Sequence, residues 1–174
     1  KREAVVERYS SAGGDKMILV GCDRDSSERA VEFAKEYEKF FAAVGVHPTA
    51  INDLTDDFLT WCRDRAIAGD VVAIGETGLD FYHMAFSEEE QRAALCKQAR
   101  LAVELDLPLI VHSRDKGMVS SKIDMENKFD PGKVGPSGQG CLDILLEEGV
   151  KKAIFHCFSY NLDFASKVWE AGYL

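Results

Sequence analysis

Residues 71–76 read VVAIGE, an uninterrupted apolar run that ends on the carboxylate of Glu76. Two later runs of the same kind, LPLIVH and KAIFH, end on His112 and His156. A continuous apolar composition is typical of parallel strands that are buried on both faces. In parallel α/β folds the active site lies at the carboxyl ends of the strands. We therefore expect Glu76, His112 and His156 to meet at one edge of a sheet and to bind a metal ion.

Outward from this stretch, strand and helix signals alternate along the whole chain. We expect strands at 17–21, 40–46, 71–76, 107–112 and 152–157, and helices at 1–12, 26–37, 53–68, 87–105, 141–148 and 162–171. A closed eight-stranded barrel needs eight such units and about 250 residues. The pattern favours an α/β fold, a TIM-like (β/α) barrel that is incomplete, with about five βα units. A complete five-stranded open sheet is the alternative.

The chain is expected to form a single domain over residues 1–174 that lacks the first strand and the C-terminal strands of such a barrel. One stretch, 116–140, is rich in Gly, Pro, Ser and charge and has little periodicity. Long segments of this kind inside a domain are functional or disordered. We interpret it as an insertion loop beyond the strand that ends on His112. A solvated insertion is favoured over a lid on the site.

The overall charge excludes one way of binding nucleic acid. The chain has 21 basic and 30 acidic residues and a formal charge of −9, so a broad basic surface is not expected. Five scattered cysteines without a CxxC pair indicate reduced thiols, in the cytoplasm or the nucleus. No apolar run reaches the roughly 18 residues of a membrane span, so no membrane association is expected.

The three residues at the strand ends suit a transition-metal site. Glu76 is expected to be a catalytic residue and a metal ligand, since a carboxylate can bridge two cations. His112 and His156 would be the other ligands, while Cys157 should point to the opposite side of its strand and pack. A Glu–His–His set suits Zn²⁺, Mn²⁺ or Fe²⁺ better than an all-oxygen Mg²⁺ site. The alternatives are a helix-capping Glu76 and a core His112.

Other polar residues follow the same strands. Asp80 is expected to act with Glu76 on metal-bound water or substrate, and His47 to contact substrate. Arg114 offers a planar fork for a phosphate, although an ion pair with Asp115 is a competing interpretation. Ser113 or Asp115 would orient the imidazole of His112. For His83, which lies in the loop after Asp80, the sequence indicates no partner.

At this point the motifs resemble those of a known family, the TatD-type metal-dependent deoxyribonucleases of the amidohydrolase superfamily. The motifs are GVHP at 45–48, AIGETGLDFY at 73–82, LPLIVHSRD at 107–115 and FHCFS at 155–159. Gln91 and Gln98 also fit the family pattern. The resemblance implies a TIM-like barrel with two divalent ions, Mg, Mn or Zn, and 3′→5′ exonuclease-like hydrolysis of single-stranded DNA or DNA 3′ ends. It implies that Glu76 bridges the ions, that His112 and His156 complete one shell, and that His47 and Arg114 lie near the substrate.

The chain also departs from the family. It contains no His-x-His motif, and the Asp near the end of the family's last strand has no counterpart. One metal site is thus expected to be intact, and the other to keep only Glu76. The leading function is a metal-dependent hydrolase, a deoxyribonuclease. The alternatives are a non-catalytic fragment or pseudoenzyme with one metal site, and a related hydrolase of an ester or amide.

Overall fold

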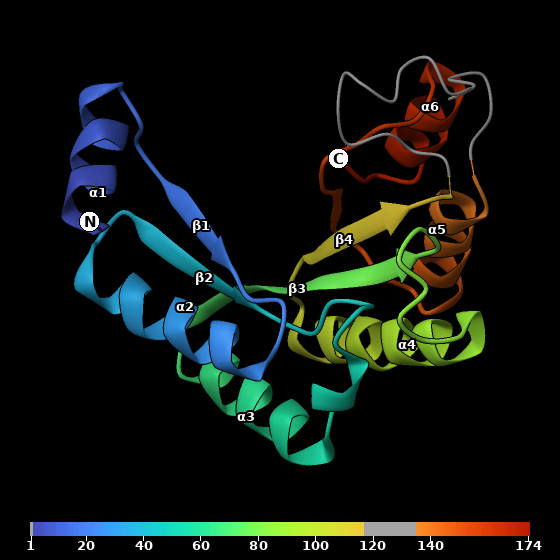
Figure 1. Cartoon of the computed structure of the whole chain (residues 1–174), viewed down its shortest axis with the longest axis horizontal. Coiled ribbons are helices and arrows are strands. Elements are labelled where there is room, and N and C mark those ends of the chain that lie inside the picture. The colour runs from blue at the N-terminus through green and yellow to red at the C-terminus, as the bar shows by residue number, and fades with distance from the viewer. Residues whose placement is uncertain (1, 117–134) are drawn as a thin grey trace.

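The computed structural model describes residues 2–116 and 135–174 and contains one parallel sheet of five strands. The strands are β1 (Met17–Val20), β2 (Phe40–Val44), β3 (Val71–Asp80), β4 (Leu109–Arg114) and β5 (Ala153–Phe155). Their order in the sheet is their order in the chain, and each neighbouring pair is parallel. The sheet curves like part of a barrel wall (Figure 1). The predicted incomplete TIM-like α/β fold is confirmed.

One helix precedes β1, and the others follow the strands. They are α1 (Arg2–Ser11), α2 (Arg24–Glu36), α3 (Asp56–Ile67), α4 (Glu88–Leu105), α5 (Pro136–Glu147) and α6 (Leu162–Glu170), with a short 3₁₀ turn, η1 (Ile51–Asp53). In Figure 1, α2, α3 and α4 all lie on the convex side of the sheet. Right-handed crossovers that always advance in one direction place every helix on the same face. The main core is therefore one layer between sheet and helices, and it includes Val44, Phe58, Ile74, Leu95 and Leu109.

The concave face of the sheet is covered much less. A small cluster of Ala43, Ala73 and Ile110 lies apart from the main core. At the two edges of the sheet, Ile18 in β1 is 45% exposed and Ile154 in β5 is 38% exposed among the described residues. The expectation that the sheet is covered on both faces holds in its middle, where Ala43, Ala73 and Ile110 are buried, and is wrong at the two edge strands. In a closed barrel the opposite strands cover this face, and five strands do not reach around to do so.

Two helices begin elsewhere than predicted. The N-cap of α2 is Asp23, which forms a capping box with Ser26, so the helix does not start at the two serines. The predicted helix from residue 53 is divided, because η1 comes first and α3 then starts after its N-cap Thr55. Helix α4 begins close to the predicted position, after its N-cap Ser87, which forms a capping box with Glu90.

The predicted loop at 116–140 ends earlier than expected. Helix α5 begins at Pro136, a residue type favoured in the first turn because its missing N–H has no helical partner there. Asp115 accepts a hydrogen bond from the backbone N–H of Ser137 (2.9 Å), which stabilises this first turn. The remaining part of the predicted insertion, 117–134, lies outside the described residues. The choice between a solvated insertion and a lid therefore stays a prediction.

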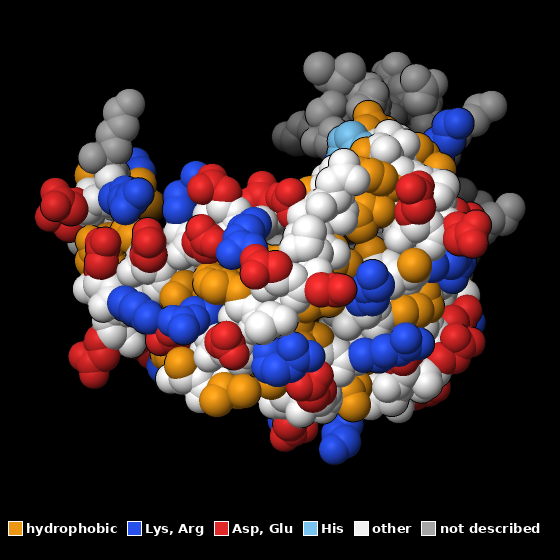
Figure 2. Space-filling view, turned by 90° about the horizontal axis from the view of Figure 1, so that it is seen from below, with side chains coloured by type: hydrophobic (Ala, Val, Ile, Leu, Met, Phe, Trp, Pro, Cys, Tyr) orange, Lys and Arg blue, Asp and Glu red, His pale blue; other side chains and the backbone are white. Residues whose placement is uncertain are grey.

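The helical face of the molecule carries charges of both signs, interspersed (Figure 2). Arg63 and Arg100 there bind Glu104 and Glu148 through two hydrogen bonds each. This surface is not a basic patch. Among the described helices, none combines the length and the apolar character that crossing a membrane would need.

Candidate metal centre

Glu76 lies within β3 and receives two imidazoles. Its Oε1 is 3.0 Å from Nδ1 of His156 and 3.3 Å from Nδ1 of His112. Burial raises the pKa of the Glu76 carboxyl, but the hydrogen bonds with the two histidines outweigh this and lower the pKa to about 2. The three residues that the sequence analysis assigned to a metal are therefore brought together, around a carboxylate that stays ionised.

Glycine lets β3 and β4 approach closely around these side chains. Gly78 pairs with His112 in the sheet and has a φ of 150°, which side-chain-bearing residues rarely adopt. A Cβ atom at Gly78 would collide with the carbonyl oxygen of His112. The glycine of the ETG sequence thus has a steric role, which is to hold His112 against the strand that carries Glu76.

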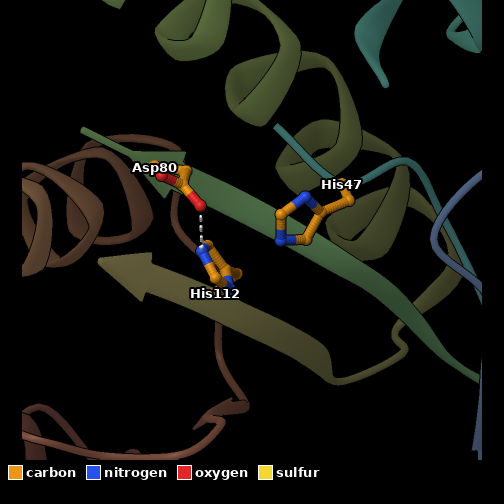
Figure 3. A group of neighbouring side chains, drawn as sticks. All are labelled: His47, Asp80 and His112. Carbon is orange, nitrogen blue, oxygen red and sulfur yellow. Dashed lines mark hydrogen bonds and ion pairs between the residues drawn. The ribbon is translucent and has the colours of Figure 1, made fainter. Parts of the chain in front are cut away.

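Asp80 is the last residue of β3, and its side chain is fully buried. Its Oδ2 lies 3.1 Å from Nε2 of His112, the contact drawn in Figure 3, and 2.8 Å from Nδ1 of His83. Its Oδ1 accepts the backbone N–H groups of Tyr82 (3.0 Å) and His83 (2.7 Å). Burial raises the pKa of the Asp80 carboxyl, and the hydrogen bonds from His83 more than offset this, so the net pKa is lowered.

His112 therefore stands between two carboxylates, with Nδ1 facing Glu76 and Nε2 facing Asp80. A neutral imidazole has a single N–H and can donate to only one of them. The other contact would then join two hydrogen-bond acceptors, which is unfavourable unless a positive charge is present. An imidazolium or a bound cation supplies that charge. Glu76 and Asp80, not the predicted Ser113 or Asp115, orient this ring.

His47 comes from the segment after β2 and lies against His112, with ring centroids 4.2 Å apart. Its Nδ1 is 2.7 Å from Oγ1 of Thr49 and accepts the backbone N–H of Thr49 at 3.2 Å. Burial and the neighbouring His112 lower the pKa of His47 to about 4, so the ring is neutral near pH 7. The ring is in the form that can bind a metal or donate an N–H to an anion.

Two overlapping donor sets result, and they share His112. His47, Asp80 and His112 offer ligand atoms that all lie within 4.8 Å of one another, which makes them a candidate metal site (Figure 3). Glu76, His112 and His156 form the other set, with contacts of 3.0 and 3.3 Å. Two ligands bound about 2.0–2.1 Å from one tetrahedral ion are themselves roughly 3.3 Å apart. This spacing matches the two contacts of Glu76, and the group of His47, Asp80 and His112 fits a divalent cation. The nitrogen-rich donors favour Zn²⁺ or Mn²⁺.

The last predicted ligand is the most exposed one. His156 follows β5 directly, its backbone N–H donates to Val111 (2.8 Å), and 53% of its side chain is accessible. Cys157 is exposed and has a φ of 53°, so the prediction that it packs in the core is wrong. The strand ends at Phe155, and the alternation of side chains that motivated the prediction does not extend to Cys157.

Arg114 and Asp115, at the end of β4, have separate surroundings. The guanidinium carbon of Arg114 lies 4.1 Å from the ring centroid of Tyr82. Asp115 is buried and accepts hydrogen bonds from Ser137 and from the hydroxyl of Tyr160 (3.4 Å). Asp115 thus stabilises the start of α5, and Arg114 remains at the site.

Two buried glutamines of α4 fasten the segments that carry the site. Gln91 accepts the backbone N–H of Asp80 (2.7 Å) and donates to its carbonyl oxygen (3.1 Å). Gln98 makes the same pair of bonds with Val46, at 2.8 and 3.0 Å, and donates to Oγ1 of Thr77 at 2.7 Å. Each glutamine therefore fixes the backbone at or beside a site residue, Asp80 or His47. The sequence analysis named both glutamines only as part of the family pattern and did not predict these hydrogen bonds.

Two further neighbours were missed. His83, for which the sequence indicated no partner, contacts Asp80. Cys22, which follows β1, donates to Oε2 of Glu76 (3.7 Å), and burial raises the pKa of its thiol to about 11. A single cysteine after a short strand carries no signal of such a position. For His83, the signal was its spacing of three residues from Asp80.

Comparison with known proteins finds one family over the whole chain. The family model described as TatD related DNase matches residues 1–174. An uncharacterized metal-dependent hydrolase of Bacillus subtilis, YabD, is 30% identical over 98% of this chain and 60% of its own length. The 3′-5′ ssDNA/RNA exonuclease TatD of Cronobacter sakazakii is 40% identical over 66% of this chain and 43% of its own length.

A solved structure supports the fold in the same way. The crystal structure of YJJV, a TatD homologue from Escherichia coli, aligns with a TM-score of 0.77 and 26% identity. The alignment covers 99% of this chain and 60% of that protein. The chain thus spans about 60% of the length of relatives that it matches from end to end.

Proposed function

Because the chain belongs to the TatD related DNase family, we propose that it carries the hydrolytic centre of a metal-dependent phosphodiesterase that acts on DNA. The expected substrate is single-stranded DNA or the 3′ end of a DNA strand. The observation that carries the proposal is the position of His112, whose two nitrogens lie against two buried carboxylates. This arrangement requires positive charge, and metal-dependent hydrolysis would supply it. An enzyme of this kind would work in the cytoplasm or the nucleus, where the five free cysteines stay reduced.

We assign the metal to Glu76, His112 and His156. The ionised Glu76 would be the anionic ligand, and the two imidazoles would bind through the nitrogens that face it. When bound, a divalent ion lowers the pKa of a coordinated water and polarises the phosphoryl group. Mg²⁺, Mn²⁺ and Zn²⁺ are the candidates, and two ions, as in the family resemblance, would need ligands beyond these three.

The other site residues would act on the substrate or the water. Arg114 would bind a phosphate oxygen, because its planar guanidinium suits that geometry. His47 is neutral and would donate its N–H to a second oxygen. Asp80, whose pKa is lowered, would accept a proton from the attacking water directly, because one nitrogen of His112 would bind the ion and the other would donate to Asp80.

A non-catalytic role is the second candidate. The 174 residues contain no His-x-His motif, which the resemblance implies for the other half of a two-ion site. A chain with one metal site would then bind an ion and nucleic acid without cleaving it. Related chemistry on an ester or amide is less favoured, since Arg114 beside the site suits a phosphate.

Cleavage of a labelled single-stranded oligonucleotide separates these functions. We expect slow release of nucleotides from the 3′ end with Mn²⁺, no cleavage with EDTA, and loss of more than 100-fold in rate for Glu76→Ala. Glu104→Ala, which removes an exposed carboxylate bound to Arg63, is the matched control. Cleavage that persists in Glu76→Ala would contradict the assignment. Folded protein that binds the metal but cleaves nothing would favour the second candidate.

A further inference from the structure

Tyr82 lies at the rim of the metal centre without a place in the core. It follows β3 by two residues, and 47% of it is exposed. The backbone N–H of Tyr82 is held by Oδ1 of Asp80 (3.0 Å), whose other oxygen contacts His112. The same carboxylate thus belongs to the site and fixes the position of this aromatic residue.

The ring is already paired with a cation. The guanidinium of Arg114 lies over it at 4.1 Å, and the ring of His83 stands nearly perpendicular to it, at 84° and 4.9 Å. A guanidinium stacked on an aromatic face keeps its N–H edge available for hydrogen bonds. The pair therefore presents an exposed aromatic ring and a phosphate-binding group side by side.

Most arginines among the described residues pair with a carboxylate, whereas Arg114, like Arg2 over Phe33, lies over an aromatic ring. Six other arginines are paired with carboxylates: Arg24, Arg29, Arg63, Arg65, Arg92 and Arg100. Within the described residues, Arg114 has no such partner and stacks on Tyr82 instead. Its guanidinium therefore forms no ion pair with a described carboxylate, and Arg114 lies in β4 two residues after His112. The arrangement favours an anionic ligand that also has a flat apolar face, which is the chemistry of a nucleotide.

We propose that Tyr82 stacks on the base of the nucleotide whose phosphate Arg114 binds, and so positions a single strand at the metal centre. This inference rests on the proposed function. Bases that stack on aromatic residues must be free of a duplex, and such stacking tolerates any sequence. Tyr82 would therefore be a positioning residue that selects single strands over duplex ends.

The test uses binding, so it does not depend on turnover. The probes are two fluorescein-labelled decanucleotides with Ca²⁺ present, one with all its bases and one with abasic residues at its three 3′-terminal positions. Stacking of one base has an effect of about 5-fold to 100-fold on affinity. We expect the wild-type chain to prefer the base-bearing strand by at least about 5-fold. Tyr82→Phe should keep this preference, and Tyr82→Leu should abolish it by weakening only the base-bearing complex.

Trp169→Leu is the matched control. Trp169 is an exposed aromatic residue in the last turn of α6. Leu174, which follows this helix, donates its backbone N–H to Ala153 at the start of β5, the end of the strand away from the site. This variant should bind both strands like the wild type. A Tyr82→Leu variant that keeps the preference, or a wild type that binds both strands equally, would overturn the role of Tyr82 and leave the phosphodiesterase proposal standing. Absence of binding to either strand would contradict both.

Discussion

The buried part of the metal centre and its exposed rim are held in different ways. Asp80 is fully buried, and its carboxylate makes four contacts, while α4 holds its backbone through Gln91. His156, at the rim, is 53% exposed and faces Glu76 through a single nitrogen. The difference indicates that the buried part is organised before any ligand arrives, whereas the rim responds to metal and substrate. Changes to the two parts should therefore affect different measurements.

The largest effect on the free energy of unfolding is expected for Gln98, which holds the backbone beside the buried part of the metal centre. Gln98→Leu leaves the backbone groups of Val46 and the hydroxyl of Thr77 without a partner. Unsatisfied buried groups cost about 1–3 kcal/mol each, so the free energy of unfolding should fall by roughly 3–5 kcal/mol. Urea denaturation measures this change.

The matched control is Gln139→Leu, because within the described residues the side chain of Gln139 donates to the exposed Asp143 alone. Its free energy of unfolding should change by less than about 0.5 kcal/mol. Equal effects of the two substitutions would contradict the idea that α4 organises the buried part of the site.

A smaller effect is expected from acid. The pKa of His47 is lowered from 6.5 to about 4, so between these pH values the unfolded chain binds more protons than the folded chain. Stability should therefore fall as the pH decreases through this window. Above pH 4.5, His47 can contribute at most about 2.5 kcal/mol of this loss. Below pH 4.5 the lowered pKa of Glu76 adds a further loss of the same sign.

Melting temperatures in EDTA from pH 7 to pH 3 separate the two groups. His47→Gln should remove the decrease between pH 6.5 and 4.5 and keep the decrease below it. A His47→Gln profile that follows the wild type over the upper window would show that His47 is not buried in its neutral form.

Much of the fold could be predicted, because five apolar runs separated by amphipathic segments leave few arrangements of a parallel sheet. The meeting of Glu76, His112 and His156 was predicted from strand ends, although Glu76 and His112 lie inside β3 and β4 and only His156 follows its strand. The predictions that failed concerned the bounds of single elements. β3 continues four residues beyond its apolar run to Asp80, and the Gly- and Pro-containing start of α5 has the composition of a loop.

Side-chain contacts between segments that are distant in the chain could not be predicted from the sequence either. Nothing in a single sequence indicates that Arg114 stacks on Tyr82, since Arg114 ends β4, Tyr82 follows β3, and the two meet through the register of these strands. The same holds for Gln98 and Val46, which are 52 positions apart. Side-chain roles that depend on register and helix orientation become visible only in the folded chain.

The most direct test of the central claim is a titration with Mn²⁺ and Zn²⁺ by calorimetry, comparing three Gln substitutions. We predict that Glu76→Gln abolishes binding of the ion, that His156→Gln weakens it by about 10-fold or more, and that His47→Gln leaves it within about threefold of the wild type. The reverse pattern, with binding lost in His47→Gln and kept in Glu76→Gln and His156→Gln, would place the ion between His47, Asp80 and His112 and contradict the account.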